Sequence, residues 1–301
     1  MRLRIPFAIF LALAGARPGL AGEAGSARTP LAFLSDFRGG GHLLYYFNHP
    51  DAAREERFVS QGGMEVDFSF VSRPDRWHAR LRFEILAGMG ESVAENLPFS
   101  PKEMAYDINP YLEYRAGGRT IRAGLAHMCR HLIYKDDETP WYLEEGTNFP
   151  SDVYFNRLYA GIGSAEAQAE ERWQTLLRSD GDRAQFPRAI WRAEVAGYLR
   201  SLGGLMDAES LSGGNDWQAD AKVDLMLPLR VRPACAWFAA SRTQVLFDTH
   251  FEPTWIERLE LEAIFANREY GTSIFLAWNV VDEHPLDSRE ELVELGARFF
   301  F

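Results

Sequence analysis

Three residues with chemically active side chains stand at alternate positions of one short segment, GLAHMCRHLIYKDDE. His127, Cys129 and His131 are each separated by one residue, and such residues share one face of an extended strand. A histidine can take the proton of a neighbouring thiol, and the resulting thiolate is a nucleophile, so these residues could carry out nucleophilic catalysis. Neighbouring nitrogen and sulfur ligands also suit Zn²⁺, so a zinc site is an alternative interpretation.

An amide side chain that could orient His127 lies in the next patterned segment, SDVYFNRLYAGIG. Asn156 shares its alternation with the apolar residues Leu158 and Ile162. If the two segments are neighbouring antiparallel strands joined by a loop, Asn156 comes close to His127. Because an amide oxygen can fix the tautomer of an imidazole, we predict a catalytic site of His127 as base, Cys129 as nucleophile and Asn156 as orienting residue.

Acidic residues follow the histidines, at Asp136, Asp137 and Glu138. Carboxylate oxygens are the ligands that Ca²⁺ prefers, so Asp136 and Asp137, with His131, are predicted as a metal site. The ion would serve as an enzyme cofactor or as a bridge to lipopolysaccharide phosphates. The alternative is a solvated acidic loop, in which case the histidines and Tyr134 only mark the level of the lipid headgroups.

The elements that must position these residues are strands, because a period of two dominates the chain. In WHARLRFEILAGM every odd position from Trp77 to Met89 is apolar, and the even positions from His78 to Glu84 are polar. WQADAKVDLMLPL repeats the pattern. The charged residues expected to face the interior are Arg80, Arg82, Glu84, Arg192, Glu194, Asp220, Lys222, Asp224, Glu260 and Glu262.

This pattern predicts an all-β fold, a transmembrane antiparallel up-and-down β-barrel of about 12 strands. The alternating stretches exceed the ~5–6 residues of soluble strands and suit the ~9–11 tilted residues that cross a bilayer. Lipid offers no partner to a strand edge, so the sheet must close. A soluble β-sandwich or lipocalin-like barrel is the alternative, because one wet sheet face also produces alternation. The strands are expected at 41–47, 57–72, 76–89, 105–116, 119–133, 152–163, 187–200, 216–229, 234–246, 255–267, 270–279 and 290–301.

The connections between these strands alternate in length, as short periplasmic turns and longer external loops should. The short ones include 116–119 and 230–233. The exception is 164–186, which is long on the periplasmic side and contains AEAQAEERWQTLLR, a predicted short helix. This segment is either a periplasmic appendage or a sign that the strand count is wrong. Pro110 is a second irregularity, because proline removes a donor from a strand ladder.

The beginning of the chain predicts export. Basic residues precede an apolar run from Ile5 to Ala16, and small residues follow, which is typical of a cleaved signal peptide at 1–21. No other apolar run approaches the ~20 residues of a membrane-spanning helix. Residues 22–40 are expected to form an N-terminal periplasmic segment and 41–301 the barrel, located in the outer membrane.

The net charge limits the expected binding partners, and the positions of the cysteines bear on whether they pair. The formal net charge is −11, and removal of three arginines with residues 1–21 makes it −14, so nucleic acid is not an expected partner. Cys129 and Cys235 could pair in an oxidising envelope. The predicted strands place them near opposite ends of the barrel, however, and a disulfide needs Cα atoms within ~7 Å. We therefore expect no bridge between them.

The segment LVELGARFFF, with apolar residues alternating up to Phe301, resembles the insertion signal of bacterial outer-membrane barrels. This resemblance implies an outer-membrane location with outer-membrane lipid and lipopolysaccharide as neighbours. It also implies recognition of this strand by the barrel-assembly machinery.

Residues 122–163 resemble the outer-membrane phospholipase A family, whose twelve-stranded barrel carries an external triad. In that family a His-x-Ser motif on one strand meets an Asn in an Asn-Arg-Leu-Tyr segment on the next. Here His127 and the NRLY segment beginning at Asn156 match, and Cys129 stands in the place of the serine. The family's Asn-Gly is replaced at positions 130–131. The same segment is also similar to an uncharacterised family of envelope barrels without established activity.

Two functions follow from these observations. The leading one is an integral outer-membrane barrel of unassigned role, structural or forming a narrow channel. The alternative, implied by the resemblance, is a phospholipase A-like acyl hydrolase with an external His127, Cys129 and Asn156 site and Ca²⁺ as its cofactor.

Overall fold

The computed structural model describes residues 30–50, 58–73, 76–92, 97–133, 152–167, 169–199, 217–267, 269–283 and 289–301. Within the chain, Leu31–Phe301 form one compact unit. The predicted signal peptide at 1–21 lies outside the described residues.

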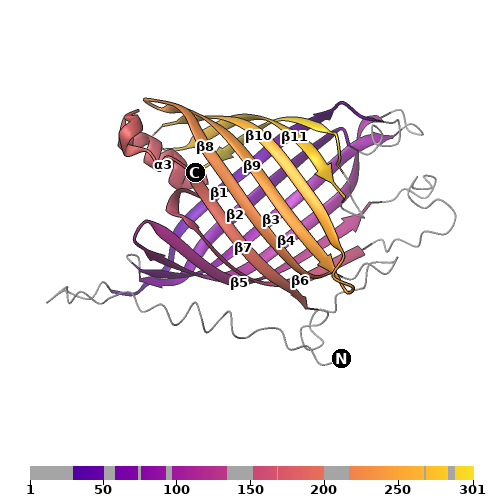
Figure 1. The fold of residues 1–301 in the computed structure, drawn as a ribbon, viewed down its shortest axis with the longest axis horizontal. Coiled ribbons are helices and arrows are strands. Elements are labelled where there is room, and N and C mark those ends of the chain that lie inside the picture. Colours follow the sequence, from indigo (N-terminus) through magenta and orange to yellow (C-terminus); the bar gives the residue numbers. More distant parts are fainter. Residues whose placement is uncertain are drawn as a thin grey trace. The chain divides into compact units, whose positions relative to one another are not determined.

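The described residues form twelve antiparallel strands that close into a barrel (Figure 1). Each strand pairs with its neighbours in the sequence, and β1 pairs with β12 from Gly40 opposite Phe300 to Phe47 opposite Val293. The predicted up-and-down barrel of 12 strands is therefore confirmed. The strands are β1 (Ala32–Phe47), β2 (Ser60–Arg73), β3 (Trp77–Ser92), β4 (Leu97–Ala116), β5 (Arg119–Leu132), β6 (Asp152–Ser164), β7 (Ile190–Leu199), β8 (Trp217–Arg232), β9 (Cys235–Asp248), β10 (Pro253–Ala266), β11 (Gly271–Asp282) and β12 (Val293–Phe300).

The first strand begins at Ala32, earlier than the alternation indicates. Assigning all of 22–40 to a segment ahead of the barrel is wrong for residues 32–40, which pair with β2. The register shifts between Ser35 and Arg38. Such an irregularity breaks the period of two, and this explains why the sequence pattern does not reveal the start of the strand.

One end of the barrel, here called the turn end, carries the short connections β2–β3, β4–β5, β8–β9 and β10–β11. The other end is called the loop end. Between β4 and β5 the turn residues Gly117 and Gly118 have φ of +57° and +72°. Two successive positive φ angles are what a tight hairpin turn requires, and glycine adopts them without strain. The predicted turn at 116–119 is thus present.

The outer surface of the barrel is apolar. On β8, alternate residues from Val223 to Leu229 are 40–59% exposed, and Leu295 of β12 is 50% exposed. The intervening Asp224 and Lys222 line the interior instead. A contiguous apolar surface of this kind is unfavourable in water and is the expected lipid-facing band of a membrane barrel. In the part of the chain that the structure describes, no helix is long and apolar enough to cross a membrane.

The interior holds ion pairs between strands. Arg80 of β3 is 1% exposed, and its guanidinium contacts the carboxylates of Asp36 and Asp67. Tyr111 donates a hydrogen bond of 2.5 Å to Asp67. Arg157 of β6 contacts Asp220 of β8 at 2.7 Å. Because a buried charge without a partner is costly, these pairs make the inward register of the strands specific.

A helical segment occupies the connection between β6 and β7. It contains the 3₁₀ helix η2 (Ala165–Ala167), the helix α3 (Ala169–Ser179) and the 3₁₀ helix η3 (Arg183–Gln185). The predicted short helix is therefore present, and the strand count with it is correct. Figure 1 shows α3 at the same end of the barrel as the end of β12.

α3 packs into the turn end of the barrel. Trp173 and Leu176 lie one helical turn apart, are 6% and 1% exposed, and belong to one buried apolar cluster. The cluster also contains side chains from β7, β9, β10 and β12, namely Ile190, Phe238, Ile264 and Phe300. Arg172 and Ala167 line the interior cavity itself. The segment is therefore packed against the turn end of the barrel and is not a detached appendage.

The proline inside β4 interrupts one ladder. Pro110 pairs with Leu81 of β3, whereas the pairing of β4 with β5 skips from Ile108 opposite His127 to Tyr111 opposite Gly124. The strand continues on both sides of this gap in the same register. The proline is accommodated because it faces a break in hydrogen bonding.

Candidate functional site

The strands β5 and β6 bring two of the predicted site residues together. His127 lies directly opposite Asn156 in the antiparallel register. His127 Nδ1 and Asn156 Oδ1 are 2.9 Å apart, within hydrogen-bonding distance. The pairing of β5 with β6 therefore creates the imidazole–amide contact.

The contact lies on the outer face of the barrel. Leu158, two residues beyond Asn156 on the same face of β6, is 51% exposed, whereas Arg157 between them points inward to Asp220. Asn156 itself is 0% exposed and His127 is half-buried. The amide is thus a fixed, covered group, while part of the imidazole stays accessible.

The third predicted residue follows on the same strand face. Cys129 stands two positions beyond His127, which places their Cα atoms about 7 Å apart along an extended strand. Its register partners are Tyr106 of β4 and Tyr154 of β6, and it is half-buried. By strand alternation the histidine and the thiol share one side of β5, and Cys129 also borders the interior cavity.

Of the predicted metal site, only His131 lies within the described residues. His131 lies opposite Met104 and its ring stands edge-on to that of Tyr106, with centroids 5.8 Å apart. Asp136 and Asp137 lie outside the described residues. In the described part of the chain, no group of three His, Cys, Asp or Glu side chains could hold a metal ion.

The two cysteines lie at different levels of the barrel. Cys235 begins β9 and pairs with Arg232 at the turn end, whereas Cys129 lies toward the loop end of β5. Both are described, and no disulfide joins them.

The external contact defines the protonation pattern of the histidine. The Asn156 oxygen is an acceptor only, so the hydrogen bond requires that His127 Nδ1 carries the proton and donates it. Nε2 of a neutral imidazole then holds the lone pair and can accept a proton from another group. The pair is chemically equipped to act as an oriented general base.

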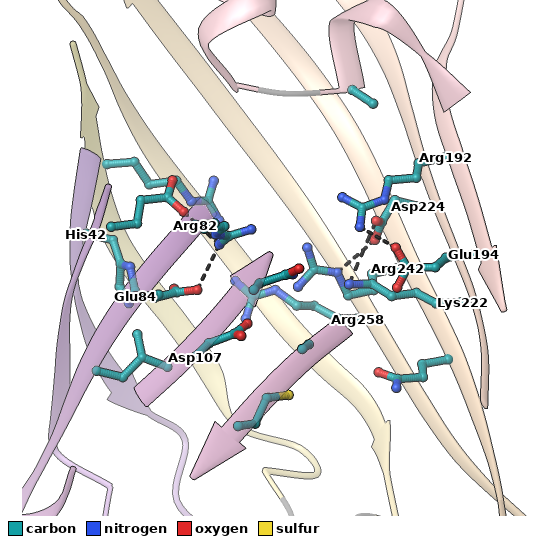
Figure 2. Close-up of a pocket in the computed structure, with 18 of the residues that line it drawn as sticks. His42, Arg82, Glu84, Asp107, Arg192, Glu194, Lys222, Asp224, Arg242 and Arg258 are labelled. Carbon is teal, nitrogen blue, oxygen red and sulfur yellow. Dashed lines mark hydrogen bonds and ion pairs between the residues drawn. The ribbon is translucent and has the colours of Figure 1, made fainter. Parts of the chain in front are cut away.

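A second candidate site lies inside the barrel. A cavity of about 760 Å³ is lined by charged side chains from strands around the whole barrel. Figure 2 shows two groups of these side chains facing each other, with His42, Arg82, Glu84 and Asp107 on one side. The residues labelled on the other side are Arg192, Glu194, Lys222, Asp224 and Arg242.

Some of these cavity residues are predicted from the sequence, and others are not. Arg82, Glu84, Arg192, Glu194, Lys222, Asp224, Glu260 and Glu262 line the cavity as predicted, and Arg80 and Asp220 are buried in ion pairs. Asp107 and Arg242 are missed, although each shares its alternation with other inward residues, Asn109 and Gln244. That alternation is the signal by which they could have been found.

The closed antiparallel barrel with an apolar outer surface and a charged interior defines a bacterial outer-membrane β-barrel. The structure is similar to an outer membrane channel from Pseudomonas putida F1, at 10% identity and a TM-score of 0.51, covering 93% of this chain and 99% of the channel. Outer membrane phospholipase A from Escherichia coli is also similar, at 10% identity and a TM-score of 0.44, with 89% and 97% of the chains covered. No protein-family model and no curated protein matches the sequence. These likenesses concern the fold.

Proposed function

We propose that this barrel is an outer-membrane acyl hydrolase that acts on lipid esters at its outer surface. The observation that carries the proposal is the 2.9 Å contact between His127 Nδ1 and Asn156 Oδ1. A buried amide that fixes the tautomer of a partly exposed histidine is what a catalytic base requires, and an ordinary headgroup-level histidine does not need it.

In the proposed reaction Cys129 is the nucleophile. Its thiol gives a proton to His127 Nε2, and the thiolate sulfur attacks the ester carbonyl carbon. The carbon–oxygen bond to the alcohol breaks, the alcohol takes the proton back from His127, and a thioester with Cys129 remains. Water, activated by His127, then releases the fatty acid and restores the thiol.

The position of the site suits a lipid substrate. Leu158, on the same outer face as Asn156, is exposed, and the exposed band of β8 continues such a surface elsewhere on the barrel. A lipid in the bilayer therefore meets His127 without leaving its apolar surroundings. Ca²⁺, which the resemblance implies, would add positive charge for the developing oxyanion. The described residues alone do not supply three ligands for it.

The test is release of fatty acid from mixed micelles, with and without Ca²⁺, by wild type and variants. His127→Ala is expected to lower the rate by at least about 10³-fold, because loss of a catalytic histidine removes nearly all of the nucleophile's activation. Cys129→Ala should do the same. Cys235→Ala is the matched control, because this cysteine lies at the turn end on β9, away from His127. Background release by wild type under both conditions would remove the hydrolase proposal.

A second candidate function is a narrow polar passage, favoured by the 760 Å³ charged cavity inside the barrel. In this case α3 would close the turn end until it is displaced. Conductance across planar bilayers tests this candidate, and current steps with the wild-type protein are the expected result. Their absence in both wild type and a Leu176→Ala variant would argue against it.

The proposal also covers the cellular location of the protein. We place it in the outer membrane after export through a cleaved signal peptide, with lipid and lipopolysaccharide around the outer face. β12 would be the strand that the barrel-assembly machinery recognises. The support is the apolar alternation of this strand, in which Leu295 and Phe299 are 50% and 40% exposed.

A further inference from the structure

Two rows of charged residues stand on opposite walls of the interior cavity. On one wall, Glu65 of β2, Glu84 of β3 and Asp107 of β4 are direct neighbours in the register. They are called here the acidic row. On the other wall, the neighbours in register across β7 to β10 are Arg192, Asp224, Arg242 and Arg258, called the basic row.

The barrel geometry makes these rows face each other. β3 is the central strand of the acidic wall, and β9 is one of the two central strands of the basic wall. They are six places apart in a ring of twelve strands, so they are diametrically opposed. All seven side chains of the two rows line the same cavity of about 760 Å³. Figure 2 shows Glu84 and Asp107 on one side of it and Arg192, Asp224 and Arg242 on the other.

The acidic row carries an excess of negative charge. Arg82 lies between two of its members, with Nη2 2.6 Å from Glu65 and 2.8 Å from Glu84. Arg82 thus pairs with two of the three carboxylates of the acidic row. Asp107 Oδ1 is buried and accepts no hydrogen bond from the described part of the chain. This wall can accept a cationic N–H donor.

The basic row carries the complementary excess around Arg242. Arg192 contacts Glu194 at 2.5 Å, a carboxylate that Arg157 also contacts at 2.7 Å. Arg258 contacts Glu260 at 3.0 Å and Glu294 at 2.5 Å. Arg242 and Lys222 instead share Asp224, at 2.8 and 3.9 Å. Two cations therefore face one carboxylate.

Arg242 also keeps donors directed at the cavity. Its hydrogen bond to Asp224 uses Nε, and within the described residues its terminal nitrogens make no hydrogen bond. Its side chain is 53% exposed, whereas that of Arg82 on the opposite wall is 34% exposed. A planar guanidinium edge of this kind matches a carboxylate in bidentate geometry.

We propose that the cavity binds a small zwitterion whose carboxylate and ammonium groups stand at opposite ends, as in a short peptide. The carboxylate contacts Arg242 and Lys222, and the ammonium contacts Glu84 and Asp107. The charges on opposite walls require a ligand with separated charges, and the cavity volume falls in the range of small-molecule sites. This site is independent of the external hydrolase, and binding to it does not require conductance.

Equilibrium dialysis of the purified barrel in detergent micelles against radiolabelled triglycine tests the proposal. The comparators are acetyl-triglycine, which lacks the ammonium group, and triglycine amide, which lacks the carboxylate. Triglycine is expected to bind at least tenfold more tightly than either. The reason is that each comparator leaves one wall without its partner.

Two variants distinguish the contributions of the two walls to triglycine binding. Arg242→Gln should weaken triglycine binding at least fivefold and bring it to the level of triglycine amide, and Glu84→Gln should bring it to the level of acetyl-triglycine. Arg230→Gln, at an exposed position on β8 that does not line the cavity, is the control and should bind as wild type does. The heat-dependent gel shift of folded barrels verifies that each variant is folded.

Three results would overturn the proposal. The first is no triglycine binding by folded wild type, and the second is equal binding of triglycine and both comparators. The third is unchanged binding by the folded Arg242→Gln or Glu84→Gln variant. If acetyl-triglycine binds tightly and Glu84→Gln does not change its affinity, the cavity is an anion site instead, and the proposal is wrong.

Discussion

Truncation of Leu176 should release α3 from the turn end of the barrel. This side chain is 1% exposed and packs in the apolar cluster that joins the helix to β7, β9, β10 and β12. Replacing a buried leucine by alanine costs about 2–5 kcal/mol. Since 1.4 kcal/mol is a factor of ten, the undocked population should rise by about 30- to 4000-fold.

The rate of tryptic cleavage after Arg172 measures that population. In the docked helix this side chain is 11% exposed, donates to the Ala167 carbonyl at 3.1 Å and lines the cavity, so the protease must wait for undocking. When docking is fast relative to cleavage, the rate follows the open population. Leu176→Ala should therefore be cut faster by the same factor. The matched control is Gln174→Ala, an exposed position on the same helix.

Either of two results would contradict the docking of α3 through Leu176. One is a rise of less than about threefold in Leu176→Ala, which would mean that the buried contact does not hold the helix. The other is an equal rise in Gln174→Ala, which would mean that helix stability alone controls cleavage.

Three further predictions concern the site, the interior and one turn. Asn156→Ala should lower fatty-acid release about 5- to 150-fold, because an unmet buried donor on His127 costs about 1–3 kcal/mol; an unchanged rate contradicts the orienting role. Glu294 is 0% exposed and lies 2.5 Å from Arg258. Glu294→Ala should lower the free energy of unfolding of the protein by about 3–5 kcal/mol, measured by urea titration in lipid vesicles. A decrease below about 1 kcal/mol refutes the pairing. In the same titration Gly118→Val should cost about 1–2 kcal/mol, because its φ is +72°; no change would mean that the turn adopts another form.

Most of the fold could be predicted because lipid imposes a strict rule on each strand. In β8 every second side chain meets hydrocarbon, so the apolar positions Val223 to Leu229 appear directly in the sequence. The turn at Gly117 and Gly118 follows from backbone conformation and is equally local. Such local constraints need no knowledge of distant residues.

The parts that were missed depend on contacts between distant residues. The start of β1 at Ala32 is hidden by the irregular register near Ser35, which only pairing with β2 makes regular. The docking of α3 requires Phe238, Ile264 and Phe300, which lie far along the chain and share no pattern with the helix.

The two candidate sites differ in the same way. The meeting of His127 with Asn156 could be anticipated, because neighbouring strands joined by one loop are brought together by simple pairing. The position of the acidic row opposite the basic row could not be anticipated from the sequence. It depends on the exact register of β2 to β4 and of β7 to β10 and on the number of strands that closes the ring.

The place of α3 in the chain has a consequence for the order of assembly. The helix precedes β7, yet the surface that receives it includes side chains of β9, β10 and β12, which follow it in the chain and are made later. Its docking is thus a contact of high sequence separation, and such contacts form late. The mouth of the barrel should seal only after the last hairpin is in place, so a protected helix would serve as a natural reporter that maturation is complete.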